Sequence, residues 1–163
     1  MSESDPVRRA FDASYRRLVG QLYAVCGDLT EAEDVVAEAF ARAVQHRRTF
    51  ERTDNPEAWL RTVAVNVSRT RHRRRLLGAR LERSEVRHPE IGDDRLALVT
   101  ALRQLPAPQR EAIALHYLAD LPVHEVAAAT GAPIGTVKAR LSRGRVALAQ
   151  LLSVTDEEEA RHG

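Results

Sequence analysis

The chain contains 163 residues, which is enough for one ordinary domain or two small ones, and its formal net charge is +2. Of these residues, 44% are hydrophobic and only 4% are aromatic, a composition that supports packed cores and favours aliphatic helix packing. No apolar run approaches the roughly 20 residues of a membrane span, and the N-terminus has neither the basic nor the apolar region of a secretory signal. We therefore expect a cytoplasmic protein without membrane insertion. The single cysteine, Cys26, excludes an intramolecular disulfide.

Charge is unevenly distributed along the chain. Lys138 is the only lysine, so 24 of the 25 basic residues are arginine (25 − 1), and the planar guanidinium of arginine suits phosphates and guanine edges. Acidic residues gather at positions 31–38 and again at 156–159, whereas arginines gather at 69–75. This segregation predicts separate surfaces for nucleic acid and for a protein partner.

Two amphipathic helices are predicted in the first 45 residues. Asp5 followed by Pro6 can begin the first helix, and Gly27 can end it. Its apolar stripe has helical spacing and consists of Val7, Phe11, Leu18, Leu22 and Val25. The pattern Thr30-Glu31-Ala32-Glu33 is a capping box and predicts that the second helix begins there. The outer side of the second helix is expected to carry Glu31, Asp34, Glu38 and Arg42.

A third long helix is predicted after a polar loop at residues 46–55, where apolar periodicity disappears. Asn55 can cap this helix and Pro56 can occupy its first turn. Its apolar stripe includes Trp59, for which core packing is favoured over stacking on a nucleic-acid base. On a different side, one polar ridge consists of Thr62, Asn66, Arg69 and Arg73, and a dense basic end covers residues 69–75.

A helix-turn-helix is predicted at residues 121–152. Gly131 can adopt the left-handed conformation that ends its first helix, and Pro133 precedes a longer second helix. One face of the second helix consists of Val137, Leu141, Gly144 and Leu148, and the opposite face of Lys138, Ala139, Ser142 and Arg143, flanked by Arg140 and Arg145. This layout is typical of a recognition helix that enters the DNA major groove. The competing interpretation is an ordinary helical hairpin with a solvated charged face.

No segment alternates with period two, so we expect an all-α fold without a sheet, made of two small helical domains joined by a flexible linker. The domains are predicted at residues 5–75 and 94–153, the linker at 76–93 and an acidic, solvated tail at 154–163. The sequence has no paired carboxylates beside a metal-type cluster, no nucleophile motif and no glycine-rich phosphate loop. We therefore expect no catalytic residue, no metal ion and no cofactor, and we assign no role to His116 or His124.

Three segments, in this order, resemble the bacterial sigma-70 family, and specifically its small extracytoplasmic-function (ECF) sigma factors. Residues 32–40 (Ala-Glu-Asp-Val-Val-Ala-Glu-Ala-Phe) are similar to region 2.2. Residues 55–66, continuing into the arginines at 73–75, are similar to regions 2.3 and 2.4. Residues 105–117 and 135–143 are similar to region 4, and the likeness as a whole covers residues 11–152.

This resemblance implies a subunit that binds core RNA polymerase, through the β′ clamp helices and the β subunit, and directs it to promoters. Region 2.2 of the family docks on the clamp helices, and the matching positions here are Asp34, Ala37 and Glu38. Ala37 departs from the glutamine that is common at its position. An acidic helix face suits a basic partner, because charge complementarity sets orientation and association rate. The resemblance also implies an anti-sigma protein that sequesters the factor.

The resemblance further implies two DNA contacts, one with the −10 element, where a base of the melted non-template strand is flipped out, and one with the −35 element in double-stranded DNA. For the −10 element the implied residues are Phe50, Asp54, Asn55, Thr62, Asn66, Arg69 and Arg73, with residues 71–75 on phosphates. Asn66 matches the pocket asparagine, whose amide can both donate to and accept from a base edge. For the −35 element the implied residues are Thr136, Lys138, Ala139, Arg140, Ser142, Arg143 and Arg145.

A second interpretation stays open at this point: a free-standing helix-turn-helix transcriptional regulator with a ligand-sensing or dimerising helical first half. Such a regulator has no need for the acidic face of Asp34 and Glu38 together with the ridge of Asn66 and the basic end that follows it. The first half of the chain therefore discriminates between the two functions.

Overall fold

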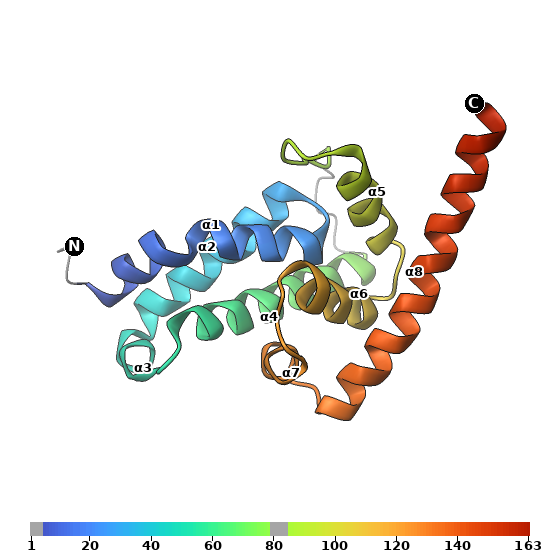
Figure 1. The fold of residues 1–163 in the computed structure, drawn as a ribbon. Coiled ribbons are helices and arrows are strands. Elements are labelled where there is room, and N and C mark those ends of the chain that lie inside the picture. Colours follow the sequence, from blue (N-terminus) through green and yellow to red (C-terminus); the bar gives the residue numbers. More distant parts are fainter. Residues whose placement is uncertain (1–4, 79–84) are drawn as a thin grey trace. The chain divides into compact units, whose positions relative to one another are not determined.

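A computed structural model describes residues 5–78 and 85–163, and every regular element in these two ranges is helical (Figure 1). The chain divides into a first unit, residues 1–87, and a second unit, residues 88–163. The all-α prediction is therefore confirmed. The division between the units falls inside the segment 76–93 that was expected to be a linker.

Four helices form the described part of the first unit: α1 (Pro6–Cys26), α2 (Leu29–Gln45), α3 (Arg47–Arg52) and α4 (Pro56–Leu76). The three long helices α1, α2 and α4 pack against one another. Aliphatic side chains from all three are fully buried between them, and these include Leu18, Leu22, Val35, Val36, Leu60 and Val65. Burial of this kind stabilises a fold by about 1.5–3 kcal/mol for each large aliphatic side chain.

The ends of these helices follow the sequence signals closely, with one exception. Asp5 caps α1, Asn55 caps α4, and Gly27 ends α1 in the left-handed conformation, at φ 73°. The capping box predicted at Thr30 is wrong, because α2 begins one residue earlier, at Leu29. The carboxylate of Asp28 accepts a hydrogen bond from the backbone N–H of Thr30 at 3.1 Å and therefore takes the capping position.

The loop predicted at residues 46–55 contains the short helix α3, and that part of the prediction is wrong. Phe50 explains why the segment is ordered: its side chain is 1% exposed and packs edge-on against the ring of Trp59, with centroids 5.2 Å apart. Arg47 adds a contact with the start of α1, where its Nη1 donates to Oδ2 of Asp5 at 2.6 Å. Trp59 is thus a packing residue, as its place in the apolar stripe indicated.

Five helical elements form the second unit: α5 (Asp93–Leu102), α6 (Ala107–Ile113), the π-helix η1 (Ala114–Leu118), α7 (Val123–Thr130) and α8 (Ile134–His162). Helix α8 packs against α5, α6 and α7. The core consists of aliphatic side chains, among them Val99, Leu102, Leu115, Val126, Val137 and Leu141.

The helix-turn-helix has the predicted turn. Gly131 ends α7 at φ 69°, and Pro133 directly precedes α8. Gly144 allows α8 to approach α6 closely, since a Cβ atom at this position would lie 2.8 Å from Cγ1 of Ile113. The acidic residues 156–159, expected in a solvated tail, are exposed and continue α8, which is a single helix of 29 residues.

Candidate partner and nucleic-acid interfaces

The outer face of α2 carries the three residues that match the core-binding positions. Asp34 and Ala37 are exposed and Glu38 is half-buried. Both acids have an arginine nearby: Nη2 of Arg42 donates to Glu38 at 2.9 Å, and Nη2 of Arg71, from α4, lies 3.5 Å from Asp34. Because Asp34 and Glu38 remain accessible to solvent, this face can meet a basic partner.

Glu31 does not belong to that outer face, contrary to the prediction. It is only 8% exposed, and its carboxylate accepts two hydrogen bonds from Arg71, at 2.9 and 3.2 Å. Nη2 of Arg75 lies 2.5 Å from the same carboxylate. Glu31 therefore joins α2 to the basic end of α4, and nothing in the local sequence pattern indicated a partner 40 positions away.

An apolar surface lies beside the acidic side chains of α2, and sequence reasoning missed it. Phe11, on α1, is 43% exposed, stacks on Tyr15 at 4.6 Å and meets the edge of Phe40, on α2, at 5.2 Å. Val44, one turn beyond Phe40, is 46% exposed. Exposed apolar side chains that cluster in this way mark an interaction surface more often than scattered ones do.

The polar ridge predicted on α4 is present. Asn66 and Arg73 are exposed, whereas Thr62 and Arg69 are half-buried. The hydroxyl of Thr62 donates to the carbonyl of Ala58 at 3.0 Å, so its free lone pair can act only as an acceptor. The ridge therefore exposes the side-chain amide of Asn66 and the guanidinium of Arg73 to a ligand.

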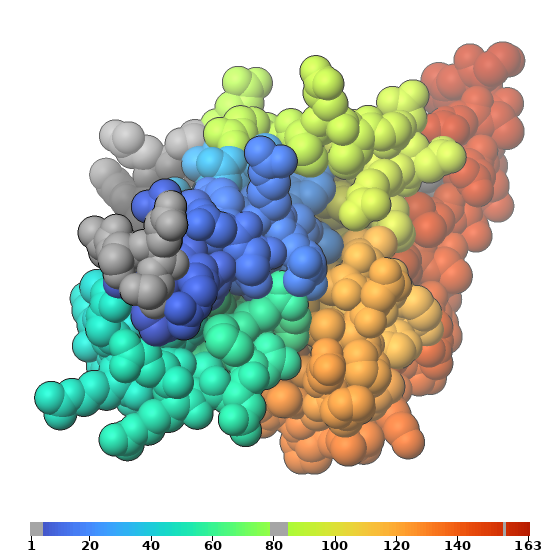
Figure 2. All heavy atoms as spheres, turned by 60° about the vertical axis from the view of Figure 1, so that its left-hand side comes forward, coloured from blue at the N-terminus to red at the C-terminus, as the bar shows by residue number. Residues whose placement is uncertain are grey.

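The segment before α4 divides into exposed and buried residues. Asp54 and Asn55 are exposed, and the side-chain oxygen of Asn55 accepts the backbone N–H of Ala58 at 3.0 Å as the helix cap. In Figure 2 this part of the first unit, drawn in turquoise, reaches the surface beside α1 in blue. Phe50, by contrast, is buried against Trp59, so we leave it out of the DNA surface.

The basic end of α4 is divided in the same way. Arg71 and Arg75 are bound to Glu31, whereas Arg73 and Arg74 are exposed at the end of the helix. A carboxylate partner neutralises a guanidinium and occupies its donors. Of the arginines expected on phosphates, Arg73 and Arg74 are consequently the better placed.

Helix α8 presents the face predicted for DNA. Lys138, Ala139, Ser142 and Arg143 are exposed, and Thr136 and Arg140 are half-buried. Val137 and Leu141, on the opposite side, are buried against the rest of the unit. Arg145 is exposed at the flank of this face, and its Nη1 donates to the hydroxyl of Tyr117 at 2.5 Å.

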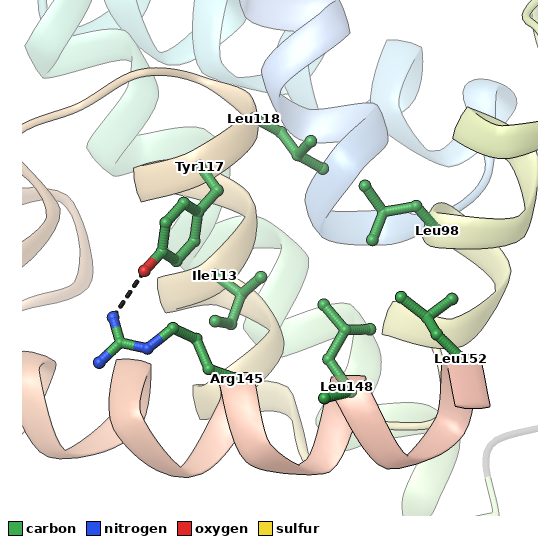
Figure 3. Close-up of a pocket in the computed structure, with 8 residues that line it drawn as sticks. Leu98, Ile113, Tyr117, Leu118, Arg145, Leu148 and Leu152 are labelled. Carbon is green, nitrogen blue, oxygen red and sulfur yellow. Dashed lines mark hydrogen bonds between the residues drawn. The ribbon is translucent and has the colours of Figure 1, made fainter. Parts of the chain in front are cut away.

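An apolar cavity of about 320 Å³ lies along α8, beyond the residues predicted to face DNA (Figure 3). It is lined by Leu98, Ile113, Tyr117, Leu118, Arg145, Leu148, Ala149 and Leu152. Tyr117 and Arg145 form its polar edge, and the other lining side chains are aliphatic. This cavity could not be predicted from the sequence, because its lining comes from α5, α6, η1 and α8.

Within residues 5–78 and 85–163, no group of three His, Cys, Asp or Glu side chains is arranged to hold a metal ion. None of the helices there combines the length and hydropathy that crossing a bilayer would require.

Comparison with known proteins gives matches in both units. Residues 10–76 match the family model for sigma-70 region 2, and residues 95–148 match the model for sigma-70, region 4. The ECF sigma factor SigC of Mycobacterium tuberculosis is 31% identical over 147 residues, which covers 85% of this chain and 80% of SigC. The ECF sigma factor SigW of Bacillus subtilis is 31% identical over 158 residues, with 85% and 84% covered.

Solved structures agree with these matches. The sigma factor RpoE of Bartonella quintana, solved in complex with the anti-sigma factor NepR, has a TM-score of 0.72 and 30% sequence identity, and the match covers 90% of this chain and 96% of that one. CnrH, solved in complex with the cytosolic domain of CnrY, has a TM-score of 0.66 at 24% identity and thus supports the fold. The presence of both regions in one chain does not favour the free-standing regulator.

Proposed function

The chain belongs to the sigma-70 family and is an RNA polymerase sigma factor of the ECF group. On this basis we propose that each of its two units recognises a different promoter element. The first unit binds core RNA polymerase and the −10 element, and the second binds the −35 element. Two modest DNA contacts on one chain reinforce each other, because binding of one raises the effective concentration of the other.

For core polymerase we propose a docking face on α2 and the adjoining part of α1, acidic on one side and apolar on the other. Asp34 and Glu38 supply the charge, and Phe11 and Val44 supply exposed apolar surface. A basic amphipathic partner such as the β′ clamp helices would match both parts. Ala37 is a small residue at the position where the family commonly has glutamine, so it lacks the polar contact that glutamine could make. The exposed apolar side chains then supply part of the binding to the partner.

For the −10 element we propose that Asn66 reads the flipped base and that Arg73 and Arg74 hold the strand through its phosphates. The support is that all three side chains are exposed on α4. Asp54 and Asn55 lie just before the helix and complete the surface. Extruding a base costs a few kcal/mol, so both the amide contacts and the phosphate contacts are needed.

For the −35 element we propose that α8 enters the major groove. Lys138 and Arg143 contact base edges, and Ala139 and Ser142 are small enough to allow close approach. Thr136, Arg140 and Arg145 lie at the margins of this face, where the phosphates of the groove would be. With few long side chains facing the bases, DNA shape contributes to specificity.

We also propose that an anti-sigma protein regulates the chain by covering these surfaces. The support is that RpoE, its structural relative, was solved with the anti-sigma factor NepR bound. An exposed patch of apolar and acidic side chains on α2 is a suitable target for such a protein.

The observation that carries the proposal is that each of the two units exposes basic side chains suited to DNA, and that the first unit also exposes an acidic face that DNA would repel. The test is transcription in vitro with purified core polymerase on genomic DNA, with sequencing of the transcript starts. We expect starts that share an upstream pair of elements and that vanish with core polymerase alone. Association with core polymerase without any specific start would contradict the proposal.

The docking face is tested separately by reversing its charge. The double variant Asp34→Arg/Glu38→Arg should lose association with core polymerase, measured by size-exclusion chromatography of the mixture. Asp156→Arg/Glu157→Arg is the matched control, since it changes the net charge equally at exposed positions near the end of α8. Equal loss in both double variants would show that overall charge, and not the α2 face, is responsible.

A further inference from the structure

Tyr117 contacts α8 at Arg145, which lies at the flank of the face predicted for DNA. Its hydroxyl accepts a hydrogen bond from Nη1 of Arg145 at 2.5 Å (Figure 3). Tyr117 is 46% exposed and Arg145 is exposed as well, so the contact lies at the surface, on the edge of the apolar cavity. The guanidinium has five N–H donors and Tyr117 occupies one of them, which leaves the others able to bind a ligand.

The position of Arg145 along α8 suits a phosphate contact. Lys138 lies seven residues earlier, two helical turns or about 10 Å along the axis, on the same side of the helix. A helix in the major groove has sugar-phosphate backbone along both of its flanks, and the groove is about 12 Å wide. With Lys138 and Arg143 placed on base edges as proposed above, Arg145 would lie two turns further along the helix, within reach of the sugar-phosphate backbone.

We propose that Tyr117 is a positioning residue for DNA binding: its hydroxyl fixes the guanidinium of Arg145 so that it meets a phosphate of the −35 duplex. The inference rests on the proposed function of α8. A phenol hydroxyl is neutral, so the contact orients the guanidinium and leaves its charge intact. Arg71 contrasts with this, because its partner Glu31 is a carboxylate and cancels the charge.

Positioning matters because an exposed arginine loses much side-chain entropy when a phosphate binds it. A guanidinium that is already held in place loses less side-chain entropy on binding, and the affinity for the phosphate is correspondingly higher. A planar guanidinium is also well suited to being fixed by a single hydrogen bond, since its remaining donors keep a rigid geometry.

The local backbone explains why Tyr117 reaches α8. It belongs to the π-helix η1, in which the N–H of Ala119 donates to the carbonyl of Ala114 at 3.0 Å. His116 supports the turn: its Nδ1 lies 2.8 Å from the carbonyl oxygen of Leu121, and its ring packs edge-on against the ring of Tyr117 at 4.7 Å. Short π-helical turns occur frequently at functional sites.

The test is a double-mutant cycle with Tyr117→Phe and Arg145→Ala, because phenylalanine keeps the ring at the cavity and removes only the hydroxyl. The full chain is bound to core polymerase, and its Kd is measured for a promoter fragment identified by the transcription experiment, over a range of salt concentrations. We expect Tyr117→Phe to weaken binding about threefold. Arg145→Ala should weaken it about tenfold and reduce the salt slope by about 1.

The decisive result is Tyr117→Phe in the Arg145→Ala background, where we expect no further loss. If the loss persists there, Tyr117 acts through packing of the cavity and the inference is overturned; unchanged or tighter binding by Tyr117→Phe overturns it as well. Arg161→Ala, which removes an exposed charge from the last turn of α8, is the matched control and should leave Kd unchanged. Unfolding curves of each variant exclude a general loss of fold.

The outcomes also distinguish this inference from the proposed function. If the wild-type complex binds the promoter and Lys138→Ala weakens binding, yet Arg145→Ala has no effect, only the role of Arg145 and Tyr117 is overturned. If the wild-type complex selects no promoter at all, the proposed function fails and the inference fails with it.

Discussion

The guanidinium of Arg71, on α4, donates two hydrogen bonds to the carboxylate of Glu31, on α2, at 2.9 and 3.2 Å. Arg75 reaches the same carboxylate at 2.5 Å. One buried acid therefore holds two arginines of the basic end of α4 against the helix that carries the proposed polymerase face. This arrangement affects both stability and the charge offered to DNA.

Glu31→Ala should lower the free energy of unfolding of the first unit by about 1–3 kcal/mol, because it removes the buried carboxylate that pairs with Arg71 and Arg75. Urea unfolding followed by Trp59 fluorescence measures this, since the single tryptophan lies in the first unit. Glu33→Gln is the control: Glu33 pairs with Arg87 at a more exposed position, where an ion pair contributes only about 0–1 kcal/mol. Equal losses in both variants would contradict a special role for Glu31.

Gly144→Ala should destabilise the second unit by about 1–3 kcal/mol, because the added Cβ would lie 2.8 Å from Cγ1 of buried Ile113. Thermal unfolding followed by far-ultraviolet circular dichroism measures the change. Gly135→Ala is the control, since a Cβ there meets nothing within 4 Å, and alanine is the better helix former by about 1 kcal/mol. In an Ile113→Ala background the cost of Gly144→Ala should shrink; an unchanged cost would exclude this clash as its cause.

The first helix cap should make stability depend on pH. The hydrogen bond from Arg47, together with those from the backbone of Val7 and Arg8, holds the pKa of Asp5 below its ordinary value of 3.8. A carboxyl group with a lowered pKa in the folded state stabilises the fold at pH values above about 4 and loses that effect as the pH falls through the folded-state pKa.

Asp5→Asn tests this, because asparagine can still cap the helix but carries no charge. The variant should be less stable than the wild type in urea unfolding at pH 7, and the difference should shrink as the pH falls below about 4 and through the lowered pKa of Asp5 in the folded state. A difference that stays constant over the whole range would mean that the ionised carboxylate has no part in it.

Asn66→Ala should reduce discrimination at the −10 element by roughly tenfold, since the variant loses both donor and acceptor toward the base edge. Transcription from promoters with single substitutions in this element measures the discrimination, and association with core polymerase should stay unchanged. Thr70→Ala, one turn away at another exposed position, is the matched control. If the Asn66 variant keeps full selectivity, the base pocket lies elsewhere.

Lys138→Ala combined with Arg143→Ala should abolish dependence on the −35 element, because these are the only long side chains on the central base-facing row of α8. Footprinting of the polymerase complex on a mapped promoter measures this as loss of upstream protection, with protection around the −10 element retained. Unchanged upstream protection would show that α8 is not the reading helix.

Much of this fold is determined by local signals that the sequence displays. Asp5 and Asn55 cap their helices as predicted, and Gly27 and Gly131 end theirs in the left-handed conformation that glycine tolerates. The long helices could be predicted because the spacing of their apolar residues is repeated over several turns. Helix α3 was missed, since six residues with one buried side chain, Phe50, carry too little periodicity to be recognised.

The sites were less predictable where partners are distant in sequence. The charge of Glu31 indicated a position on the outer face, but Glu31 is buried and pairs with Arg71, 40 positions away. Phe11 belongs to the predicted apolar stripe of α1, yet it is 43% exposed and stacks on Tyr15. The contact of Tyr117 with Arg145 could not be predicted from the sequence, because a π-helical turn has no characteristic spacing of residue types. Exposure of Asn66, Lys138 and Arg143, by contrast, followed directly from helical periodicity.

The length of α8 determines the distance between its basic residues and its acidic residues. Asp156 lies 18 residues beyond Lys138 on the same unbroken helix, a separation of about 27 Å at 1.5 Å per residue. At physiological ionic strength the field of a charge fades over about 8 Å, so in the proposed complex the carboxylates near the end of α8 would not weaken the attraction between its basic residues and DNA. The small net charge of the chain therefore results from basic and acidic groups that are separated along one helix and act independently.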